Sequence, residues 1–377
     1  MQYRTLGSTG IKVSALGYGA MRLPVKPGGK PSDVDEEKAI ACIHRAFDLG
    51  VNYIDTAHGY HGGMSEVVVG KAVAGRRDRI IVSTKNPYRK SDAGEWRRTL
   101  DKSLDRLKMD YLDLLLIHYV SYDEVVGPMA GPGHSLDAAL KARDEGLFRH
   151  FSFSSHDKPE NIIRLIDTGM FATMTVQYNL LDRANEKAIA HAHEKGMGVI
   201  IMGPIGGGRL VEPSEFQKLI PGGGKSTPEI ALRFVLSNPA VSTALSGMNA
   251  IQQVEENCAS ASREEPMSAA EMRQVERMLK ERQKLAELYC TGCGYCLPCP
   301  NEVNIPACFH AMNYHRVYGL TELARREYRA IRPDSKQADK KGKRADQCKE
   351  CGDCEDKCPQ KIPIREQLKE AAERLGK

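Results

Sequence analysis

Residues 51–60 read VNYIDTAHGY, a short apolar run that ends at Asp55 and passes into a polar loop containing Tyr60. A run of about five such residues next to turn-forming residues predicts a short, buried strand. The pattern recurs through residues 12–260, where strand-like runs alternate with segments that are apolar at helical spacing. The eight predicted strands are Val13–Gly19, Val51–Asp55, Ile80–Lys85, Tyr111–His118, Phe148–Ser154, Thr173–Gln177, Val199–Met202 and Val241–Ser246. The helical segments include Glu36–Leu49, Glu95–Leu107, Asn185–Lys195 and Pro228–Leu236.

This alternation predicts an α/β fold in which a parallel sheet closes as a (β/α)8 TIM barrel over residues 1–265. An open, doubly wound sheet is the alternative. The number of strands, and the spread of polar residues over several strand ends, favour the barrel. Ahead of it, residues 1–13 predict a short hairpin that turns at Ser8-Thr9-Gly10.

Four reactive side chains map to one edge of this barrel. Asp55, Lys85 and His118 end the second, third and fourth strands, and Tyr60 lies in the loop after the second. Chemistry in such barrels sits at the carboxyl ends of the strands. We therefore expect these four side chains to meet at one pocket mouth.

The C-terminal part of the chain is organised around cysteines. Eight of the 11 cysteines form two runs, Cys290, Cys293, Cys296 and Cys299 before Pro300, and Cys348, Cys351, Cys354 and Cys358 before Pro359. This C-x2-C-x2-C…C-P spacing is typical of proteins that hold [4Fe–4S] clusters. Zinc is the alternative for any four-cysteine site, but zinc sites usually show separate pairs of cysteines. The spacing therefore predicts two [4Fe–4S] clusters.

The two runs also predict how ligands are shared. In two-cluster ferredoxins the cysteine before proline binds the other cluster. One cluster would take Cys290, Cys293, Cys296 and Cys358, and the other would take Cys348, Cys351, Cys354 and Cys299. The short gap before Cys299 leaves uncrossed ligation open. Residues 290–377 thus predict a small, helix-rich, two-cluster ferredoxin-like domain, joined to the barrel by a helical connector at 266–289; its expected helices are Ala307–Ala330 and Ile364–Leu375.

The composition of the chain indicates which kinds of partner it binds and in which cellular compartment it works. A net charge of +5 and a pI near 8.5 are too weakly basic to indicate nucleic-acid binding. The start MQYRTLGSTG shows no export signal, and no uncharged apolar stretch reaches the ~18 residues of a membrane span. Thiols in metal-site spacing predict a reducing, cytoplasmic location. The basic segment 332–349 is either a docking site for an acidic redox carrier or a solvated linker.

Several segments resemble the signature blocks of the aldo-keto reductases. They are YIDTAHGYHGGMSEVVVG, STK, DLLLIHY, the serine pair 154–155, VQYN at 176–179, GPIGGG at 203–208 and SGMNAIQQVEEN. They occur in order over residues 1–260. The whole chain is similar to the subgroup with a C-terminal ferredoxin-like domain.

The resemblance implies a role for each residue of the first group. Tyr60 would donate a proton to a carbonyl oxygen as hydride arrives, and Lys85 would stabilise the resulting phenolate. Asp55 would keep Lys85 charged and oriented, while His118 would hold the carbonyl oxygen or relay protons. His58 and His61, on either side of Tyr60, are interpreted as surface residues.

The resemblance also implies a nicotinamide site. It assigns the carboxamide contacts to Ser154, Ser155 and Gln177, and the close approach to the pyrophosphate to Gly203, Gly206 and Gly207. The family usually has an aromatic residue where this chain has Met202, and often a Lys or Arg near Met248-Asn249. We therefore predict weak discrimination between NADP and NAD, or a preference for NAD.

Together these features predict an NAD(P)H-dependent oxidoreductase that reduces a small carbonyl compound or oxidises an alcohol. The clusters would transfer electrons or support the structure. The alternatives are an electron-transfer protein whose barrel binds another redox cofactor or partner, such as a flavin, and a non-enzymatic scaffold subunit. Hydride carries two electrons and a cubane accepts one, so the barrel and the clusters need an intermediary to exchange electrons.

Overall fold

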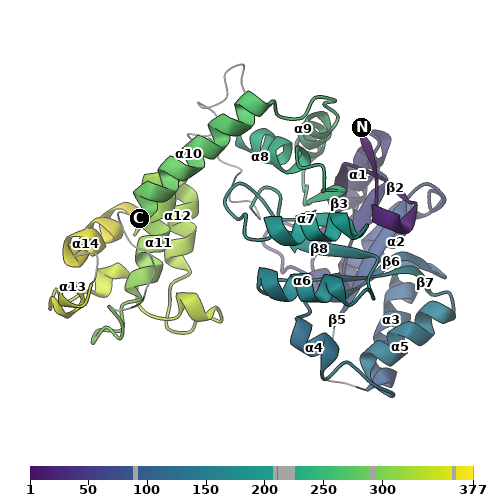
Figure 1. Ribbon diagram of the computed structural model, residues 1–377, viewed down its shortest axis with the longest axis horizontal. Helices are drawn as coiled ribbons and strands as arrows, with labels where there is room; N and C mark the ends of the chain where they lie inside the picture. The colour runs from purple at the N-terminus through teal and green to yellow at the C-terminus, as the bar shows by residue number, and fades with distance from the viewer. Residues whose placement is uncertain are drawn as a thin grey trace. The chain divides into compact units, whose positions relative to one another are not determined.

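The computed structural model describes residues 1–87, 92–206, 210, 226–287, 294, 296–358 and 362–376 (Figure 1). The chain divides into two compact units. The first comprises Met1–Gly208 and Ala231–Pro266, and the second comprises Arg209–Ile230 and Met267–Lys377. Helix α10 (Ala269–Glu287), in the stretch expected to be a connector, groups with the second unit.

The first unit is a closed barrel of parallel strands. In chain order these are β3 (Leu16–Gly19), β4 (Tyr53–Asp55), β5 (Ile81–Pro87), β6 (Leu112–His118), β7 (Phe148–Ser154), β8 (Thr173–Gln177), β9 (Gly198–Met202) and β10 (Thr243–Ser246). Each pairs with the next, and β10 closes the ring by pairing with both β9 and β3. The predicted (β/α)8 barrel is confirmed, and an open sheet is excluded because the ring has no edge strand.

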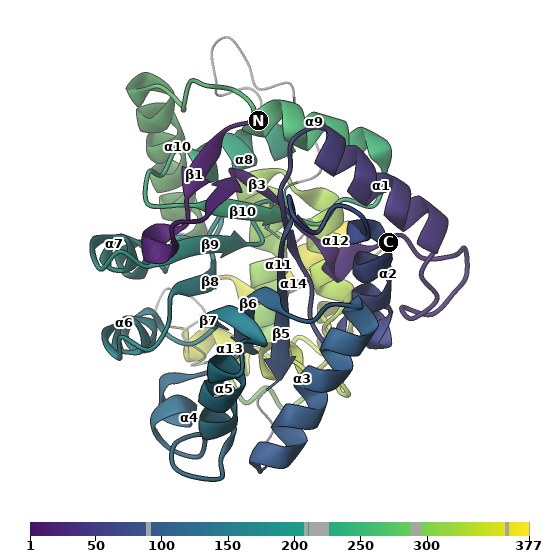
Figure 2. The same cartoon turned by 90° about the vertical axis from the view of Figure 1, so that its right-hand side faces the viewer.

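Helices cover the outside of this ring (Figure 2). They are α1 (Glu36–Asp48), α2 (Met64–Val73), α3 (Ala93–Leu107), α4 (Tyr122–Val126), α5 (Ser135–Asp144), α6 (Pro159–Asp167), α7 (Glu186–Glu194), α8 (Thr227–Leu236) and α9 (Ile251–Ala261). Strands covered on both faces read as continuous apolar runs. Strand β6 is buried at every position before His118 for this reason.

The N-terminal hairpin was also predicted correctly. Strand β1 (Tyr3–Thr5) pairs antiparallel with β2 (Lys12–Ser14), and a turn at Gly7–Thr9 joins them. The predicted first strand was too long, however, because it combined β2 with β3. The chain changes partners at Ala15, so Val13 pairs with Arg4 in the hairpin and Leu16 pairs with Ala244 in the barrel.

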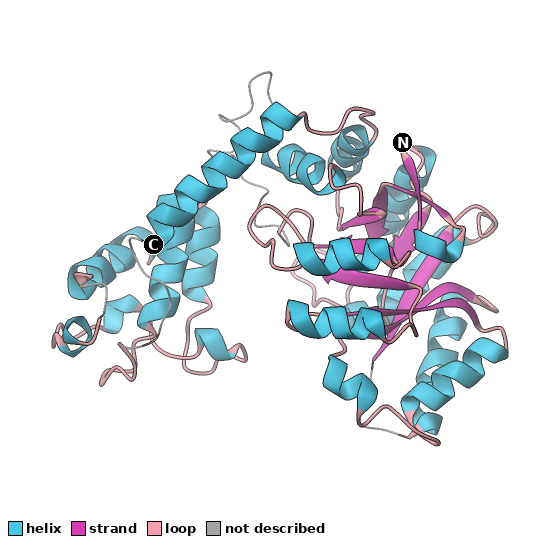
Figure 3. Ribbon diagram, viewed as in Figure 1, coloured by secondary structure: helices cyan, strands magenta, loops and turns pink. Residues whose placement is uncertain are grey.

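The second unit consists mainly of helices (Figure 3). They are α10 (Ala269–Glu287), α11 (Ile305–Tyr318), α12 (Thr321–Arg329), α13 (Asp353–Asp356) and α14 (Ile364–Leu375). One helix was expected over residues 307–330, but Gly319, at a φ of 68°, ends α11 and α12 starts anew. Helix α11 packs against both α12 and α14. No helix in the described ranges has both the length and the apolar composition needed to cross a membrane.

Candidate active site and cluster pocket

A buried ion pair lies at the carboxyl ends of β4 and β5. Lys85 Nζ contacts Asp55 Oδ1 and donates a second hydrogen bond to the carbonyl of Thr56 at 2.8 Å. Each of the two charged residues is 3% exposed. Because removing a charge from water is costly, each partner depends on the other. The barrel register places them on neighbouring strands, with Asp55 opposite Ser83 and Lys85 two residues further along β5.

The charge of Lys85 is preserved by its neighbours. Burial by itself lowers the pKa of the ammonium group. The negative charge of Asp55, the phenolic group of Tyr60 and hydrogen bonds to both outweigh that effect and raise the Lys85 pKa above its ordinary value. Lys85 is therefore a cation at physiological pH.

Tyr60 completes a compact group with Lys85 and His118. It lies in the 3-10 turn Tyr60–Gly63 that follows β4, and its phenolic group is close enough to Lys85 to raise the pKa of that residue. Lys85 Nζ is 4.9 Å from the centre of the Tyr60 ring. The His118 ring meets the Tyr60 ring edge-on, with centroids 5.8 Å apart. The four side chains that the sequence singled out thus lie together in the structure.

His118 is neutral in this setting. Burial, the positive charge of Lys85 and the neighbouring His156 lower its pKa to about 4. A neutral imidazole offers one N–H donor and one nitrogen acceptor. At physiological pH it can therefore hydrogen-bond a neutral carbonyl oxygen without adding a charge.

Two residues that the sequence analysis missed orient Asp55. Ser83 Oγ donates to Asp55 Oδ2 at 2.7 Å, and Tyr53 Oη donates to Ser83 Oγ at 2.9 Å. Both are completely buried. Ser83 lies two residues before Lys85 in the same strand and therefore on the same face, which was the available signal, and it stands opposite Asp55 in the strand register.

His61, interpreted from the sequence as a surface residue, is half-buried and bonded at both ring nitrogens. The Leu23 N–H donates to Nε2 at 3.2 Å, and Nδ1 lies 2.5 Å from the carbonyl oxygen of Pro31. These contacts tie the turn that contains Tyr60 to the loop after β3. His61 therefore supports the shape of the site.

Three predicted nicotinamide contacts lie at the ends of β7 and β8. Ser154 is buried, and its Oγ accepts a hydrogen bond from the Tyr119 N–H at 3.0 Å and donates a longer one to the Ile117 carbonyl at 3.4 Å. The Ser155 hydroxyl is already used, since it donates to the Val120 carbonyl at 2.7 Å and accepts from the Asp157 N–H at 3.1 Å. Gln177 is partly exposed and donates through Nε2 to Asp182 Oδ2 at 3.0 Å.

The glycine-rich segment after β9 is partly described. Gly203 and Gly206 have φ values of 64° and 62°, which favour glycine. Asn179 Nδ2 donates to the Gly203 carbonyl at 3.0 Å, so the turn is held against the end of β8. Gly207, which was also predicted to approach the pyrophosphate, lies outside the described residues.

Tyr119 is a further residue of this region that the sequence analysis did not identify. It follows His118 directly, adopts a positive φ of 59° and is 66% exposed. Its ring lies 5.0 Å from the ring of His156, in a tilted arrangement. An exposed aromatic residue in a strained conformation beside the reactive group indicates a constrained position at the mouth of the site.

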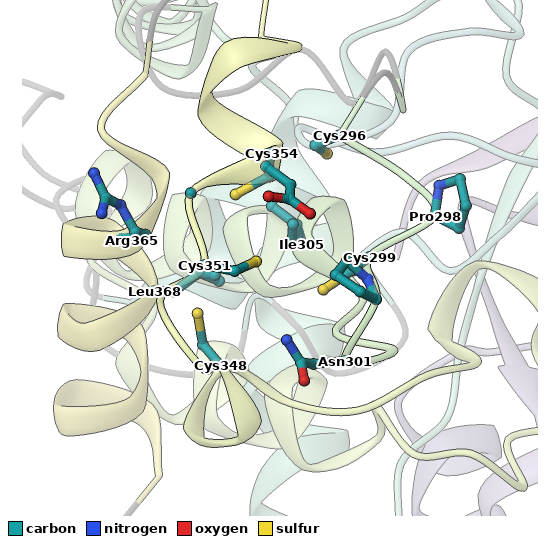
Figure 4. A pocket seen from close by; sticks show the side chains of 13 residues that line it. Cys296, Pro298, Cys299, Asn301, Ile305, Cys348, Cys351, Cys354, Arg365 and Leu368 are labelled. Carbon is teal, nitrogen blue, oxygen red and sulfur yellow. The ribbon is translucent and has the colours of Figure 1, made fainter.

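In the second unit, five cysteines line one pocket, and they are Cys296, Cys299, Cys348, Cys351 and Cys354. Figure 4 shows the sulfurs of Cys299, Cys348, Cys351 and Cys354 directed toward one another. Cys299 comes from the first run and the other three come from the second. The Glu350 N–H also donates to Cys348 Sγ at 3.4 Å, a contact of the kind that tunes iron–sulfur clusters. Cysteine sulfurs around one pocket fit a cubane cluster. The position of Cys299 beside the second run is compatible with crossed ligation, which stays a prediction.

The other predicted ligands are only partly described. Cys296 is in the lining of the same pocket, and Cys358 is buried outside that lining. Cys290 and Cys293 lie outside the described residues. Within the described ranges, no three His, Cys, Asp or Glu side chains converge tightly enough to hold a single metal ion.

The basic segment 332–349 is less positive than its sequence suggests. Lys340 pairs with Glu327 and Lys343 pairs with Glu302, each at 2.5 Å. Arg332 lies 3.4 Å from Asp334, and Arg344 lies 3.8 Å from Asp346. Much of the segment's charge is therefore balanced in place.

Comparison with known proteins agrees with this geometry. Residues 15–280 match the model of the aldo/keto reductase family, and residues 289–362 match that of a 4Fe-4S dicluster domain. L-galactose dehydrogenase from Arabidopsis thaliana is 30% identical over 76% of this chain and 96% of its own length. The NADH-specific methylglyoxal reductase of Escherichia coli is 26% identical over 67% of this chain and 91% of its own.

Solved structures show the same fold in the first unit. The holo form of aldo-keto reductase AKR11C1 from Bacillus halodurans is 27% identical, with a TM-score of 0.63, over 74% of this chain and 96% of its own. An aldo/keto reductase from Klebsiella pneumoniae, solved with NADP and acetate, is 25% identical with a TM-score of 0.62, over 74% of this chain and 96% of its own. The chain therefore belongs to the aldo/keto reductase family and carries a 4Fe-4S ferredoxin-type domain at its C-terminus.

Proposed function

We propose that this oxidoreductase uses NAD(P)H to reduce a small carbonyl compound, or NAD(P) to oxidise the corresponding alcohol. The observation that carries the proposal is the buried Lys85, which contacts Asp55 and lies with its Nζ 4.9 Å from the centre of the Tyr60 ring. A cation enclosed in this way is suited to stabilise a phenolate that forms for a moment beside it.

Each of the four residues at the site has its own role in the proposed reaction. Reduced nicotinamide, when bound, supplies the hydride. Tyr60 donates its phenolic proton to the carbonyl oxygen, and Lys85 stabilises the phenolate that remains. Asp55, fixed by Ser83, keeps Lys85 charged and in place. Neutral His118 donates a hydrogen bond that holds the carbonyl oxygen near the Tyr60 hydroxyl.

Residues at the ends of adjacent strands fit a nicotinamide. Ser154 and Gln177 offer a hydroxyl and an amide on the neighbouring strands β7 and β8, and they would hold the carboxamide. Gly203 and Gly206 would let the backbone approach the pyrophosphate. Ser155, whose hydroxyl is bonded on both sides, would keep the loop after β6 in position. The family includes proteins named for NADH and structures holding NADP, and we expect this chain to discriminate weakly between the two.

The second unit would hold two [4Fe–4S] clusters with crossed ligands. Cys299, Cys348, Cys351 and Cys354 form one ligand set around the pocket of Figure 4. Cys290, Cys293, Cys296 and Cys358 would form the other. A cluster bound by the first set would lie near the surface, since Cys351 is exposed. Exchange of single electrons with a redox partner is therefore the second function that the geometry favours.

The cysteine ligands of the second unit bear on where the protein works. Thiolate ligands persist where the environment is reducing, so we expect the protein to work in the cytoplasm. A small carbonyl or alcohol is the expected partner of the barrel, while an acidic redox carrier would have to use the lysines of segment 332–349 that local carboxylates leave unbalanced.

The test is carbonyl-dependent oxidation of NADH and NADPH by the purified protein, over a panel of small aldehydes and ketones. Lys85→Met should reduce kcat by about 100-fold or more, because the phenolate loses its cation. Nucleotide affinity, read by protein fluorescence, should stay nearly unchanged. Full activity in Lys85→Met would contradict the proposal.

A further inference from the structure

A second ion pair, between buried Glu66 and half-buried Arg106, lies behind the turn that contains Tyr60. Glu66, in the first turn of α2, is completely buried. Its Oε1 accepts a hydrogen bond from Thr84 Oγ1 at 2.7 Å, and its Oε2 accepts one from Arg106 Nη1 at 3.2 Å. A carboxylate in the interior requires such partners, so the contacts fix Glu66 between β5 and α3.

Arg106 connects this carboxylate to the backbone beside Tyr60. Its Nη1 also donates to the carbonyl of His58 at 3.1 Å. Gly63, the last residue of the turn, lies so close that a Cβ built on it would be 2.5 Å from the guanidinium carbon. The guanidinium thus touches the chain on both sides of Tyr60.

The same network borders Lys85. Thr84, which donates to Glu66, precedes Lys85 in β5, and the His58 N–H donates to the Lys85 carbonyl at 3.1 Å. Side chains alternate along a strand, so Thr84 faces the helices while Lys85 faces the site. Glu66 thus contacts the residue next to Lys85, and Arg106 contacts residues that are two and three positions from Tyr60 in the sequence.

We propose that Glu66 and Arg106 are positioning residues that set the distance between the Tyr60 phenol and Lys85. The inference rests on the proposed function, since Tyr60 must be its proton donor. Both residues act on the reacting atoms indirectly, through the backbone of residues 58–63. Proton transfer is steeply sensitive to such distances, so a small displacement would slow the chemical step while leaving binding intact.

Two variants and one matched control test this. Glu66→Gln removes the charge and keeps the shape, and Arg106→Lys keeps the charge but replaces the planar fork with a single ammonium. The control is Glu145→Gln, which breaks the exposed Arg97–Glu145 pair of 2.6 Å, whose arginine lies on the same helix α3. Both site variants should lower kcat by about tenfold or more, with KM and nucleotide Kd changed by less than about twofold. The control should match the wild type.

A second readout does not depend on turnover. Tyrosine labelled with ¹³C at Cζ gives a signal for Tyr60 that Tyr60→Phe identifies. The proposal predicts that this signal shifts or broadens in Glu66→Gln and Arg106→Lys and not in Glu145→Gln. If Glu66→Gln does not fold, Arg106→Lys carries the test.

The outcomes separate the two proposals. A wild type without carbonyl turnover would contradict the proposed function, while a displaced Tyr60 signal would still support the positioning role. An unchanged Tyr60 signal, or a loss of kcat that the fraction of unfolded protein fully explains, would overturn the positioning role.

Discussion

The charge of Lys85 depends most strongly on one neighbour. Burial lowers the Lys85 pKa, and Asp55 is the largest of the influences that raise it again. In Asp55→Asn the largest opposing influence is gone, so the Lys85 pKa should fall. Activity should then be lost at a lower pH as the solution becomes more alkaline, because only the charged form stabilises the phenolate.

The measurement is the pH dependence of kcat, with Ser83→Ala as the control that removes an Asp55 contact but keeps its charge. We also expect Asp55→Asn to lower the free energy of unfolding by about 3 kcal/mol, as is usual when one partner of a buried pair is removed. An alkaline limb of the profile at the same pH in Asp55→Asn and wild type would show that Asp55 does not control Lys85.

The lowered pKa of His118 leads to a prediction about the stability of the protein at acidic pH. Its pKa falls from an ordinary value of about 6.5 to about 4 in the folded protein. Between these values the unfolded chain binds more protons than the folded one, so stability should decline as pH falls through this window. Denaturant unfolding at several pH values should show a weaker decline in His118→Gln. An equal decline in both proteins would mean that His118 is not neutral in the folded state.

The arrangement of the loops that carry the cysteines determines which residues would bind each proposed cluster. With crossed ligands, Cys299 and Cys351 serve the same cluster. The double variant Cys299→Ser with Cys351→Ser should then retain about four of about eight irons, the same as either single variant. Uncrossed ligation predicts that the double variant loses both clusters. Iron analysis after anaerobic purification, supported by electron paramagnetic resonance, distinguishes the two.

The elements also show what could be predicted from the sequence. Buried strands such as Leu112–His118 were found because they are covered on both faces and read as unbroken apolar runs. The break at Ala15 was missed because it arises from a change of pairing partner, which local pattern does not record. The end of α11 at Gly319 was a visible signal that the helical pattern on both sides obscured.

The candidate site also contains both residues that the sequence could predict and contacts that it could not. Asp55, Tyr60, Lys85 and His118 were found because the barrel topology brings strand ends together. The Glu66–Arg106 contact joins residues 40 positions apart on two helices, and nothing in the local sequence links them. Long-range ion pairs of this kind depend on packing that only the folded chain shows.

For the whole molecule, the cofactors proposed for the two units would carry electrons in different numbers. A hydride carries a pair, and a cubane accepts one at a time. We therefore expect no bleaching of cluster absorbance when NADH or NADPH is added anaerobically to the full-length protein. Dithionite, a one-electron reductant, is the positive control. Bleaching by nicotinamide within a turnover time would point to a flavin or another mediator between the units.

Isotope labelling can follow the proposed transfer of hydride to a carbonyl carbon, with Tyr60 as the acid. The experiment uses NAD(P)H carrying deuterium at the transferred position of nicotinamide C4, with mass spectrometry of the alcohol product. We expect one deuterium on the former carbonyl carbon for the wild type, and a rate lower by about 100-fold or more for Tyr60→Phe with nucleotide binding intact. Deuterium lost to solvent, or an undiminished rate in Tyr60→Phe, would contradict the proposed transfer.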